Sequence, residues 1–181
     1  MKFFRDIIES IIDIPRKTYA PGVFDNADTE NPKLKQKVLD MIDKQMKEFE
    51  KLAPVKETSL IGSILTKRYR NDADLDINVL FDVPEAEQEE RRLQYSSLLK
   101  DINGKLVPGT AHPVNYYVIT DPKVLENNNR KADGIFSIKD NDWIKKPDED
   151  TFEPEKYEAE FQKKVQELDI PKVQEAWNDA L

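Results

Sequence analysis

Two linked motifs decide the fold: Leu60-Ile61-Gly62-Ser63 and, after ten intervening residues, Asp74-Leu75-Asp76-Ile77-Asn78-Val79. Residues 58–61 are partly β-branched, which predicts a short strand, and the glycine-serine pair predicts a turn into a brief helix. Apolar and polar residues alternate between positions 74 and 81, which predicts a second strand whose polar side chains share one face near its beginning. The sequence therefore predicts a strand, a turn and an acidic strand in succession.

Each part of this segment suits phosphate chemistry. A glycine before a helix lets the backbone approach a phosphate, while Ser63 and the N–H groups of a helix start can hydrogen-bond a triphosphate. Asp74 and Asp76 are separated by one strand residue, so their carboxylates leave the same face and can bridge Mg²⁺ or Mn²⁺. Such metals stabilise the charge on the entering and leaving oxygens of a phosphoryl or nucleotidyl transfer. The pattern predicts metal-dependent chemistry on a nucleotide.

Two other interpretations of the acidic residues exist. One is a solvated strand end that is acidic because the whole chain is acidic, with a net charge of −8. The other is a calcium loop, since Asp72, Asp74 and Asp76 imitate the first ligands of an EF-hand. That loop needs a turn glycine and a final glutamate, and the chain has Ile77 and Val83 there. The calcium loop is excluded, and the preceding glycine-serine pair favours the functional interpretation.

The glycine-serine pair, the ten-residue spacing and the Asp-apolar-Asp-apolar strand resemble the signature of the DNA polymerase β-like nucleotidyltransferase superfamily. The resemblance is strong over residues 60–81, and the preceding helix, following helix and next strand agree with the order of the family. It implies an α+β fold, with a small mixed β-sheet of the nucleotidyltransferase type flanked by N-terminal, middle and C-terminal helices. It also implies transfer of a nucleoside monophosphate from a nucleotide triphosphate to a hydroxyl of an unknown acceptor, which is RNA, a small molecule or a protein.

By this resemblance Gly62 and Ser63 contact the phosphates, and Asp74 and Asp76 are catalytic residues that hold Mg²⁺ or Mn²⁺. Lys67 and Arg70, with Arg68 between them, are candidates for contacting the triphosphate or the acceptor. The alternative for these cations is an ordinary solvated basic face. Minimal members of the superfamily often pair with a separate helical protein, so such a partner is also expected.

The family's third carboxylate belongs on the strand after the intervening helix, where this chain has Asn115. An amide is neutral and a poorer metal ligand than a carboxylate, and it cannot serve as a base. Asp133, beside a predicted strand start, is one candidate to replace it. The remaining alternatives are a weak enzyme with one metal, or a catalytically degenerate relative that binds nucleotides or a protein.

Other polar and aromatic residues have plainer interpretations. His112 is the only histidine, and its place before a proline suggests a strand start more than a catalytic base. Trp143 with residues 145–146 resembles a half-buried hairpin tryptophan with solvated lysines, although a grip on a nucleic-acid end is the alternative. Of Tyr116 and Tyr117, one is expected in the core and the other on the surface.

Periodicity predicts the remaining elements. An amphipathic helix follows a loop at 21–32, a charged exposed helix covers 85–100, and the next strand covers 114–119. Residues 134–138 and 142–144 flank a turn and are expected to form a hairpin. Further helices are predicted at 1–15, 34–52, 155–168 and from 171 onward. The first is expected to pack on the core, and the alternative for it is an interface or membrane-surface helix.

Composition sets the outer limits. We expect one domain over 1–181, with N-terminal helices in 1–54, an α/β core in 55–146 and a helical tail in 147–181. A pI near 4.9 argues against broad nucleic-acid binding. The absence of cysteine excludes disulfides and thiolate zinc sites and is consistent with a reducing cytosol. We therefore expect a cytoplasmic protein without membrane association.

Overall fold

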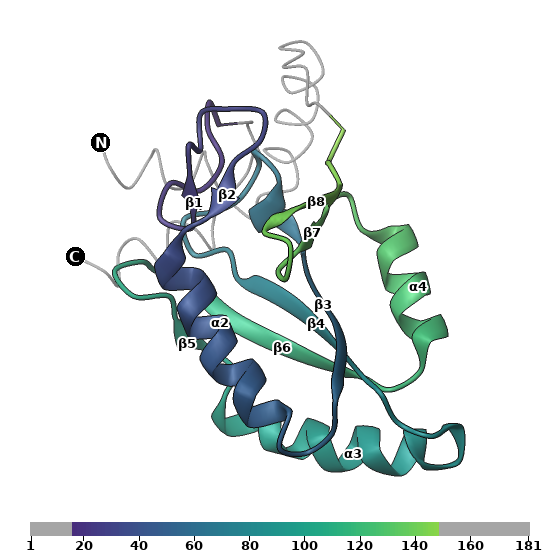
Figure 1. Ribbon diagram of the computed structural model, residues 1–181. Helices are drawn as coiled ribbons and strands as arrows, with labels where there is room; N and C mark the ends of the chain where they lie inside the picture. The colour runs from purple at the N-terminus through teal and green to yellow at the C-terminus, as the bar shows by residue number, and fades with distance from the viewer. Residues whose placement is uncertain (1–15, 149–181) are drawn as a thin grey trace, which may run out of the picture. The chain divides into compact units, whose positions relative to one another are not determined.

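The computed structural model describes residues 16–148, in which a six-stranded mixed sheet has the strand order β5-β6-β4-β3-β7-β8 (Figure 1). Neighbouring strands run antiparallel except β4 and β6, which are parallel. This arrangement confirms the predicted α+β fold with a mixed sheet. The strands are β3 (Val55–Ile61), β4 (Leu75–Phe81), β5 (Lys105–Leu106), β6 (Pro113–Ile119), β7 (Ile135–Ser137) and β8 (Asp142–Lys145).

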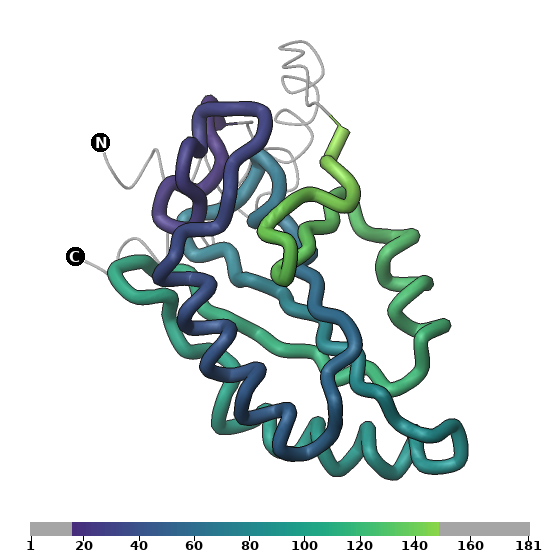
Figure 2. The backbone as a smooth tube through the Cα atoms, in the orientation of Figure 1, coloured from purple at the N-terminus to yellow at the C-terminus, as the bar shows by residue number. Residues whose placement is uncertain are grey.

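The register of the central strands decides which side chains meet. Figure 2 follows the chain through β3, a turn and β4, and then through a helical crossover into β6. Asp76 pairs with Ile61 on β3 and with Asn115 on β6. Residues that face each other across paired strands lie about 5 Å apart. Three distant parts of the chain therefore meet in one row at the same end of the sheet.

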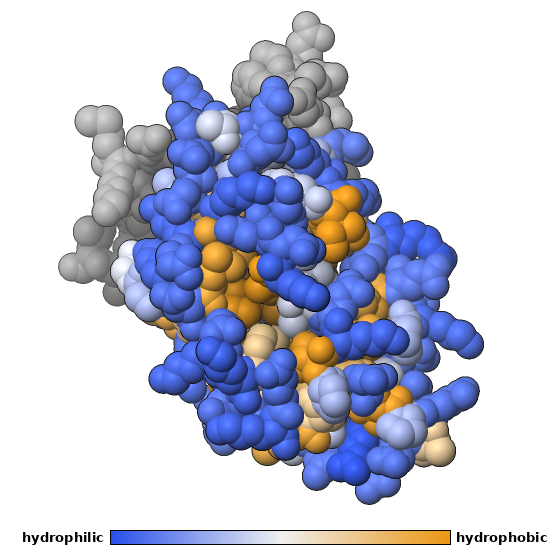
Figure 3. Space-filling view, in the orientation of Figure 1, coloured by the Kyte–Doolittle hydropathy of each residue, from blue (hydrophilic) through white to orange (hydrophobic). Residues whose placement is uncertain are grey.

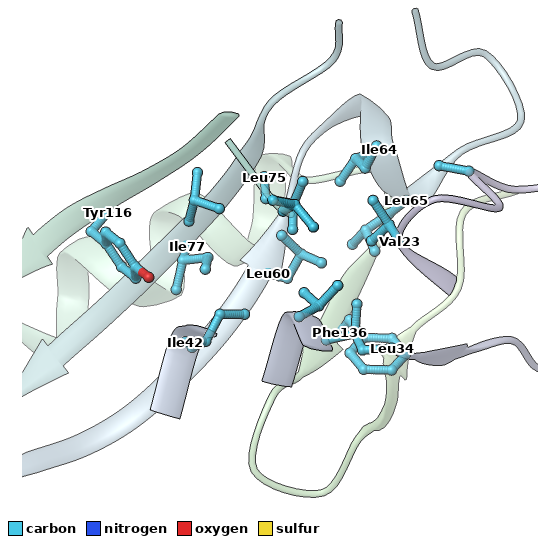
Figure 4. Close-up of a cluster of buried hydrophobic side chains, with 14 of the residues drawn as sticks. Val23, Leu34, Ile42, Leu60, Ile64, Leu65, Leu75, Ile77, Tyr116 and Phe136 are labelled. Carbon is cyan, nitrogen blue, oxygen red and sulfur yellow. The ribbon is translucent and has the colours of Figure 1, made fainter. Parts of the chain in front are cut away.

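The main core lies between this sheet and helix α2 (Gln36–Phe49), which confirms the helix predicted over 34–52 with narrower bounds. Figure 4 shows Ile42 of α2 with Leu60, Ile77 and Tyr116 of the sheet. These positions follow the helix period on α2 and the alternating period on the strands, as the sequence predicts. Burial of this apolar face is the main contribution to folding.

Helix α3 (Gln88–Leu98) forms the predicted charged crossover, with 3₁₀ turns η2 (Glu85–Glu87) and η3 (Leu99–Asp101) at its ends. It buries Tyr95, whose ring centroid lies 5.0 Å from that of Phe81. The rest of the helix is largely exposed, because its sequence carries charges on most faces. A helical crossover of this kind is what a parallel β4–β6 pair requires.

Helix α4 (Pro122–Lys131) was not predicted from the sequence. Its start carries a usable signal: Asp121 caps the helix by accepting from the Lys123 N–H at 2.9 Å, with proline at the first position. The asparagine run 127–129 has low helix propensity and hides the signal. Leu125 packs against Leu80 and Ile119 on the sheet face opposite α2, so β4 is covered on both faces.

The predicted hairpin is confirmed by β7 and β8, which pair antiparallel around a turn at Asn141. Trp143 on β8 packs on Phe24 and Phe136, with ring centroids 6.4 Å and 5.3 Å away. It is half-buried, and Lys145 and Lys146 are exposed, as the hairpin interpretation expects. The segment predicted as a loop at 21–32 forms part of a small strand pair, β1 (Phe24–Asp25) and β2 (Lys33–Leu34).

The face seen in Figure 3 is largely hydrophilic, and apolar side chains show between α2 and the β7–β8 hairpin. No helix within 16–148 is long and apolar enough to cross a membrane. The helices predicted in 1–15 and beyond 154 lie outside the described residues, and so does most of the predicted tail 147–181.

Candidate active site

Asp74 and Asp76 lie at the beginning of β4 and flank Leu75, which is fully buried in the main core. Because side chains alternate along a strand, the buried leucine turns both carboxylates to the opposite face. The Nδ2 of Asn115 donates to Asp74 Oδ2 at 2.7 Å, and the hydroxyl of Tyr117 donates to Asp76 Oδ1 at 3.1 Å. The structure thus gathers the three residues that the sequence proposes and adds Tyr117.

The electrostatics of this cluster favour a cation. Burial raises the pKa of Asp76, and the neighbouring negative charge of Asp74 raises it further, while hydrogen bonds from Tyr117 and Asn115 lower it. Burial, followed by the charge of Asp76, raises the pKa of Tyr117 to about 12. Tyr117 therefore stays a hydrogen-bond donor at neutral pH, and two carboxylates that repel each other remain for a positive ligand to pair with.

Gly62 places the backbone directly against the Asp76 carboxylate. Its φ of 95° and ψ of −179° lie in a region that is essentially restricted to glycine. A Cβ at this position would lie 2.9 Å from Asp76 Oδ2. Ser63 follows as the exposed first residue of a single 3₁₀ turn, η1 (Ser63–Leu65), which is the brief helix that the sequence predicts. The glycine-serine turn and the acidic strand start therefore adjoin in space.

Replacing Gly62 with alanine is expected to lower the thermal unfolding temperature and to weaken metal-dependent triphosphate binding at least about tenfold. The strained backbone costs about 1–3 kcal/mol, and the added methyl group displaces the Asp76 carboxylate. Gly104→Ala is the matched control, because Gly104 also has a positive φ of 83° but no atom lies within 4 Å of its added Cβ. Equal binding losses in both variants, measured by calorimetry, would contradict a special role for Gly62.

The candidate basic residues lie in the loop between η1 and β4. The ammonium of Lys67 lies 5.7 Å from the centre of the Tyr19 ring, and Arg70 forms an exposed ion pair with Asp72 at 3.5 Å. Arg68 donates its backbone N–H to Thr66 Oγ1 at 3.0 Å. The Arg70–Asp72 ion pair is exposed and therefore weak, and the Lys67 side chain is itself exposed although its aromatic partner Tyr19 is buried. Their phosphate-binding role stays a prediction.

His112 supports the site without belonging to it. Its side chain is buried, and its Nδ1 lies 2.7 Å from the carbonyl oxygen of Ala73, to which a protonated Nδ1 donates. This bond joins the start of β6 to the residue before Asp74. This geometry agrees with the prediction that His112 marks the start of a strand. The ring uses its Nδ1 in a structural contact with the backbone of Ala73.

The residues suit one divalent cation better than two. Within 16–148, no group of three or more acidic, histidine or cysteine side chains gathers as a metal cluster. Asp133 is exposed before β7, which pairs with β3 and not with β4 or β6, so it does not complete the set with Asp74 and Asp76. Two carboxylates beside the Asn115 amide supply oxygen atoms of the kind that divalent cations take as ligands.

Comparison with known families agrees with this geometry. Residues 42–173 match the family model of the nucleotidyltransferase domain, a range that begins in α2 and includes β3 to β8. No curated protein and no solved structure matches the chain. The match covers well over half of the 181 residues and includes both the glycine-serine turn and the acidic strand. The chain belongs to the nucleotidyltransferase domain family of the DNA polymerase β-like superfamily.

Proposed function

We propose that this protein is a metal-dependent nucleotidyltransferase that moves a nucleoside monophosphate from a nucleotide triphosphate to a hydroxyl acceptor. The observation that carries the proposal is the close approach of the Gly62 backbone to the Asp76 carboxylate. A Cβ at Gly62 would lie 2.9 Å from Asp76 Oδ2, so a side chain at this position would displace the carboxylate. A backbone segment without a side chain, next to two neighbouring carboxylates, suits the binding of a metal-bound triphosphate.

Each residue of the site has a different proposed role in binding. Asp74 and Asp76 hold the cation, which when bound neutralises charge on the phosphates and polarises them for attack. Gly62 permits close approach of the phosphates, and the exposed Ser63 hydroxyl is available as a donor to them. Tyr117 and Asn115 fix the orientation of the two carboxylates through their hydrogen bonds. Pre-oriented ligands reduce the ordering that metal binding requires.

The test is calorimetry of the purified protein with each nucleotide triphosphate, in Mg²⁺, in Mn²⁺ and in chelator. We expect binding that needs the metal and that Asp74→Ala removes. Asp72→Ala is the matched control, because Asp72 is two residues away but is exposed and paired with Arg70. Metal-independent binding, or equal losses in the two variants, would reject the proposed metal site.

One observation favours a second function, that of a degenerate relative that binds nucleotides or a protein without catalysis. Asn115 stands where the resemblance expects a third carboxylate, and its neutral amide donates a hydrogen bond to Asp74. A degenerate protein would bind the metal and triphosphate yet transfer nothing to any hydroxyl. Release of pyrophosphate from a bound triphosphate, followed with RNA, small-molecule and protein acceptors, separates the two functions. A helical protein partner and a cytoplasmic location remain proposals that accompany either one.

A further inference from the structure

On the face of the sheet that carries Asp74 and Asp76, one row of side chains is polar. In the sheet register, Asn78 of β4 lies between Tyr117 of β6 and Ser59 of β3, and Ser59 lies beside Ser137 of β7. Asn78 follows Asp76 by two residues on the same strand, so about 7 Å separates their backbones. This polar row therefore lies one step inward from the proposed metal site.

Three polar atoms of the row have no hydrogen-bond partner among residues 16–148: Ser59 Oγ, Asn78 Nδ2 and Asn78 Oδ1. Both residues are inaccessible, with exposures of 0% and 1%. Ser137 differs, since its hydroxyl donates to Asp140 Oδ2 at 2.6 Å. Buried polar groups nearly always have partners, because leaving one without a partner lowers stability. The unpartnered atoms therefore point to another molecule that binds them.

Helix α4 supplies a further unpartnered atom on the same face of the sheet. Leu125 packs against Leu80 and Ile119, which form the next row beyond the polar one. Asn129 lies one helical turn after Leu125 on the same side of α4. Its Oδ1 is likewise buried with no partner in the described part of the chain. Ser59 and Asn78 are inaccessible in the structure, so a ligand that binds them must displace α4, whose buried cluster with the sheet consists of these three apolar residues.

We propose that Asn78, Ser59 and Tyr117 form a recognition site for a nucleobase, under α4 and beside Asp76. An amide presents a donor and an acceptor side by side, which pair in a bidentate manner with the edge of a base. The Tyr117 ring neighbours Asn78 on the adjacent strand and offers a face for stacking. The carboxylates next to the row disfavour a phosphate or any other anion there.

This inference rests on the proposed function, since it places the base beside the site of transfer. The base belongs either to the triphosphate donor or to a nucleotide acceptor, because both present the same edge. The experiment measures affinities by calorimetry in Mg²⁺ for the four ribonucleoside triphosphates and for inorganic tripolyphosphate. A second arm uses the four homopolymeric ribotrinucleotides. The two arms distinguish a donor base from an acceptor base.

Asn78→Leu is the decisive variant, because leucine keeps the branch at Cγ and lacks the amide. We expect the wild type to prefer one base about tenfold or more, as one bidentate pairing allows. In the variant we expect a preference below about twofold, unchanged tripolyphosphate affinity and an unfolding temperature at or above that of the wild type. Ser59→Ala, a smaller change, is expected to reduce the preference in part.

Ser137→Ala is the matched control, since Ser137 lies in the same row but has its partner within the chain. It is expected to retain the base preference. A wild type without preference in either arm, or a preference that Asn78→Leu retains, would overturn the recognition site and leave ordered water as the partner of these atoms. Failure of the proposed function has a different signature, which is the absence of Mg²⁺-dependent tripolyphosphate binding.

Discussion

Asp76→Asn is expected to reduce metal-dependent nucleotidyl transfer at least about a hundredfold, since even the loss of an indirect metal partner costs about 10–100-fold. Asparagine preserves the shape of the side chain and still accepts from the Tyr117 hydroxyl, so the geometry around it persists. What the variant removes is the negative charge that the proposed metal site requires. Steady-state transfer and Mg²⁺ titrations of the two proteins measure the effect.

The same variant is expected to be more stable than the wild type at neutral pH without metal. Burial and Asp74 raise the pKa of Asp76 above its unfolded value. The stability that this carboxyl contributes is present at acid pH and is lost as pH rises through its folded pKa. Neutral asparagine does not lose stability as pH rises. The higher unfolding temperature of the variant relative to the wild type should therefore disappear as pH falls. Added Mg²⁺ should reverse the order, because only the wild type binds it.

Asp82→Asn is the control for both measurements. Asp82 directly follows β4 at the opposite end and is exposed, so its charge is far from the proposed metal. It is expected to leave transfer and the pH dependence unchanged. If Asp76→Asn retained transfer, or if its stability gain were the same at acid and neutral pH, the assignment of Asp76 would be wrong.

Asn115→Asp is expected to raise Mg²⁺ affinity about tenfold or more and to increase transfer, because it completes a set of three carboxylates. Asn115 already lies in register with Asp76 and 2.7 Å from Asp74, so a carboxylate of nearly the same shape would face the same cation. Without metal, the added charge repels Asp74 and should lower the unfolding temperature. Calorimetric titration with Mg²⁺ and thermal unfolding with and without the metal provide both measurements.

Asn115→Ala separates the charge from the loss of the amide. It removes the hydrogen bond to Asp74 without adding a ligand, so we expect a lower metal affinity than in the wild type. An Asn115→Asp variant that bound Mg²⁺ no better than the wild type would show that this position does not face the cation. That outcome would favour the degenerate function over weak catalysis.

The sequence was most informative where the direction of a side chain follows from the residues next to it. Alternation along 74–81 placed Asp74 and Asp76 on one face, and the structure agrees because buried Leu75 fixes that direction. The signal for α4 was weaker, since its cap is a single Asp-Pro pair ahead of an asparagine run. The short strands β1, β2 and β5 have two residues each, which is too few for an alternating pattern to be recognised in the sequence.

Tyr117 shows why part of the site could not be predicted. The sequence predicted that one of Tyr116 and Tyr117 lies on the surface, and the structure shows that it is Tyr117, but its hydroxyl bond to Asp76 spans 41 positions of the chain. Such a contact depends on the register between β4 and β6, which a one-residue shift would destroy. This register joins strands that are far apart in the sequence and has no local signal.

The sequence by itself determined the glycine turn, the direction of two carboxylates and the neutral residue at position 115, because these follow from residue type and local period. Only the tertiary structure decided that Asn115 meets Asp74, that Tyr117 meets Asp76 and that Leu125 of α4 packs on Leu80 and Ile119. The physical reason is that local sterics fix where a side chain points along its own strand. Which distant side chain it meets is fixed by burial of the apolar faces that bring the strands together.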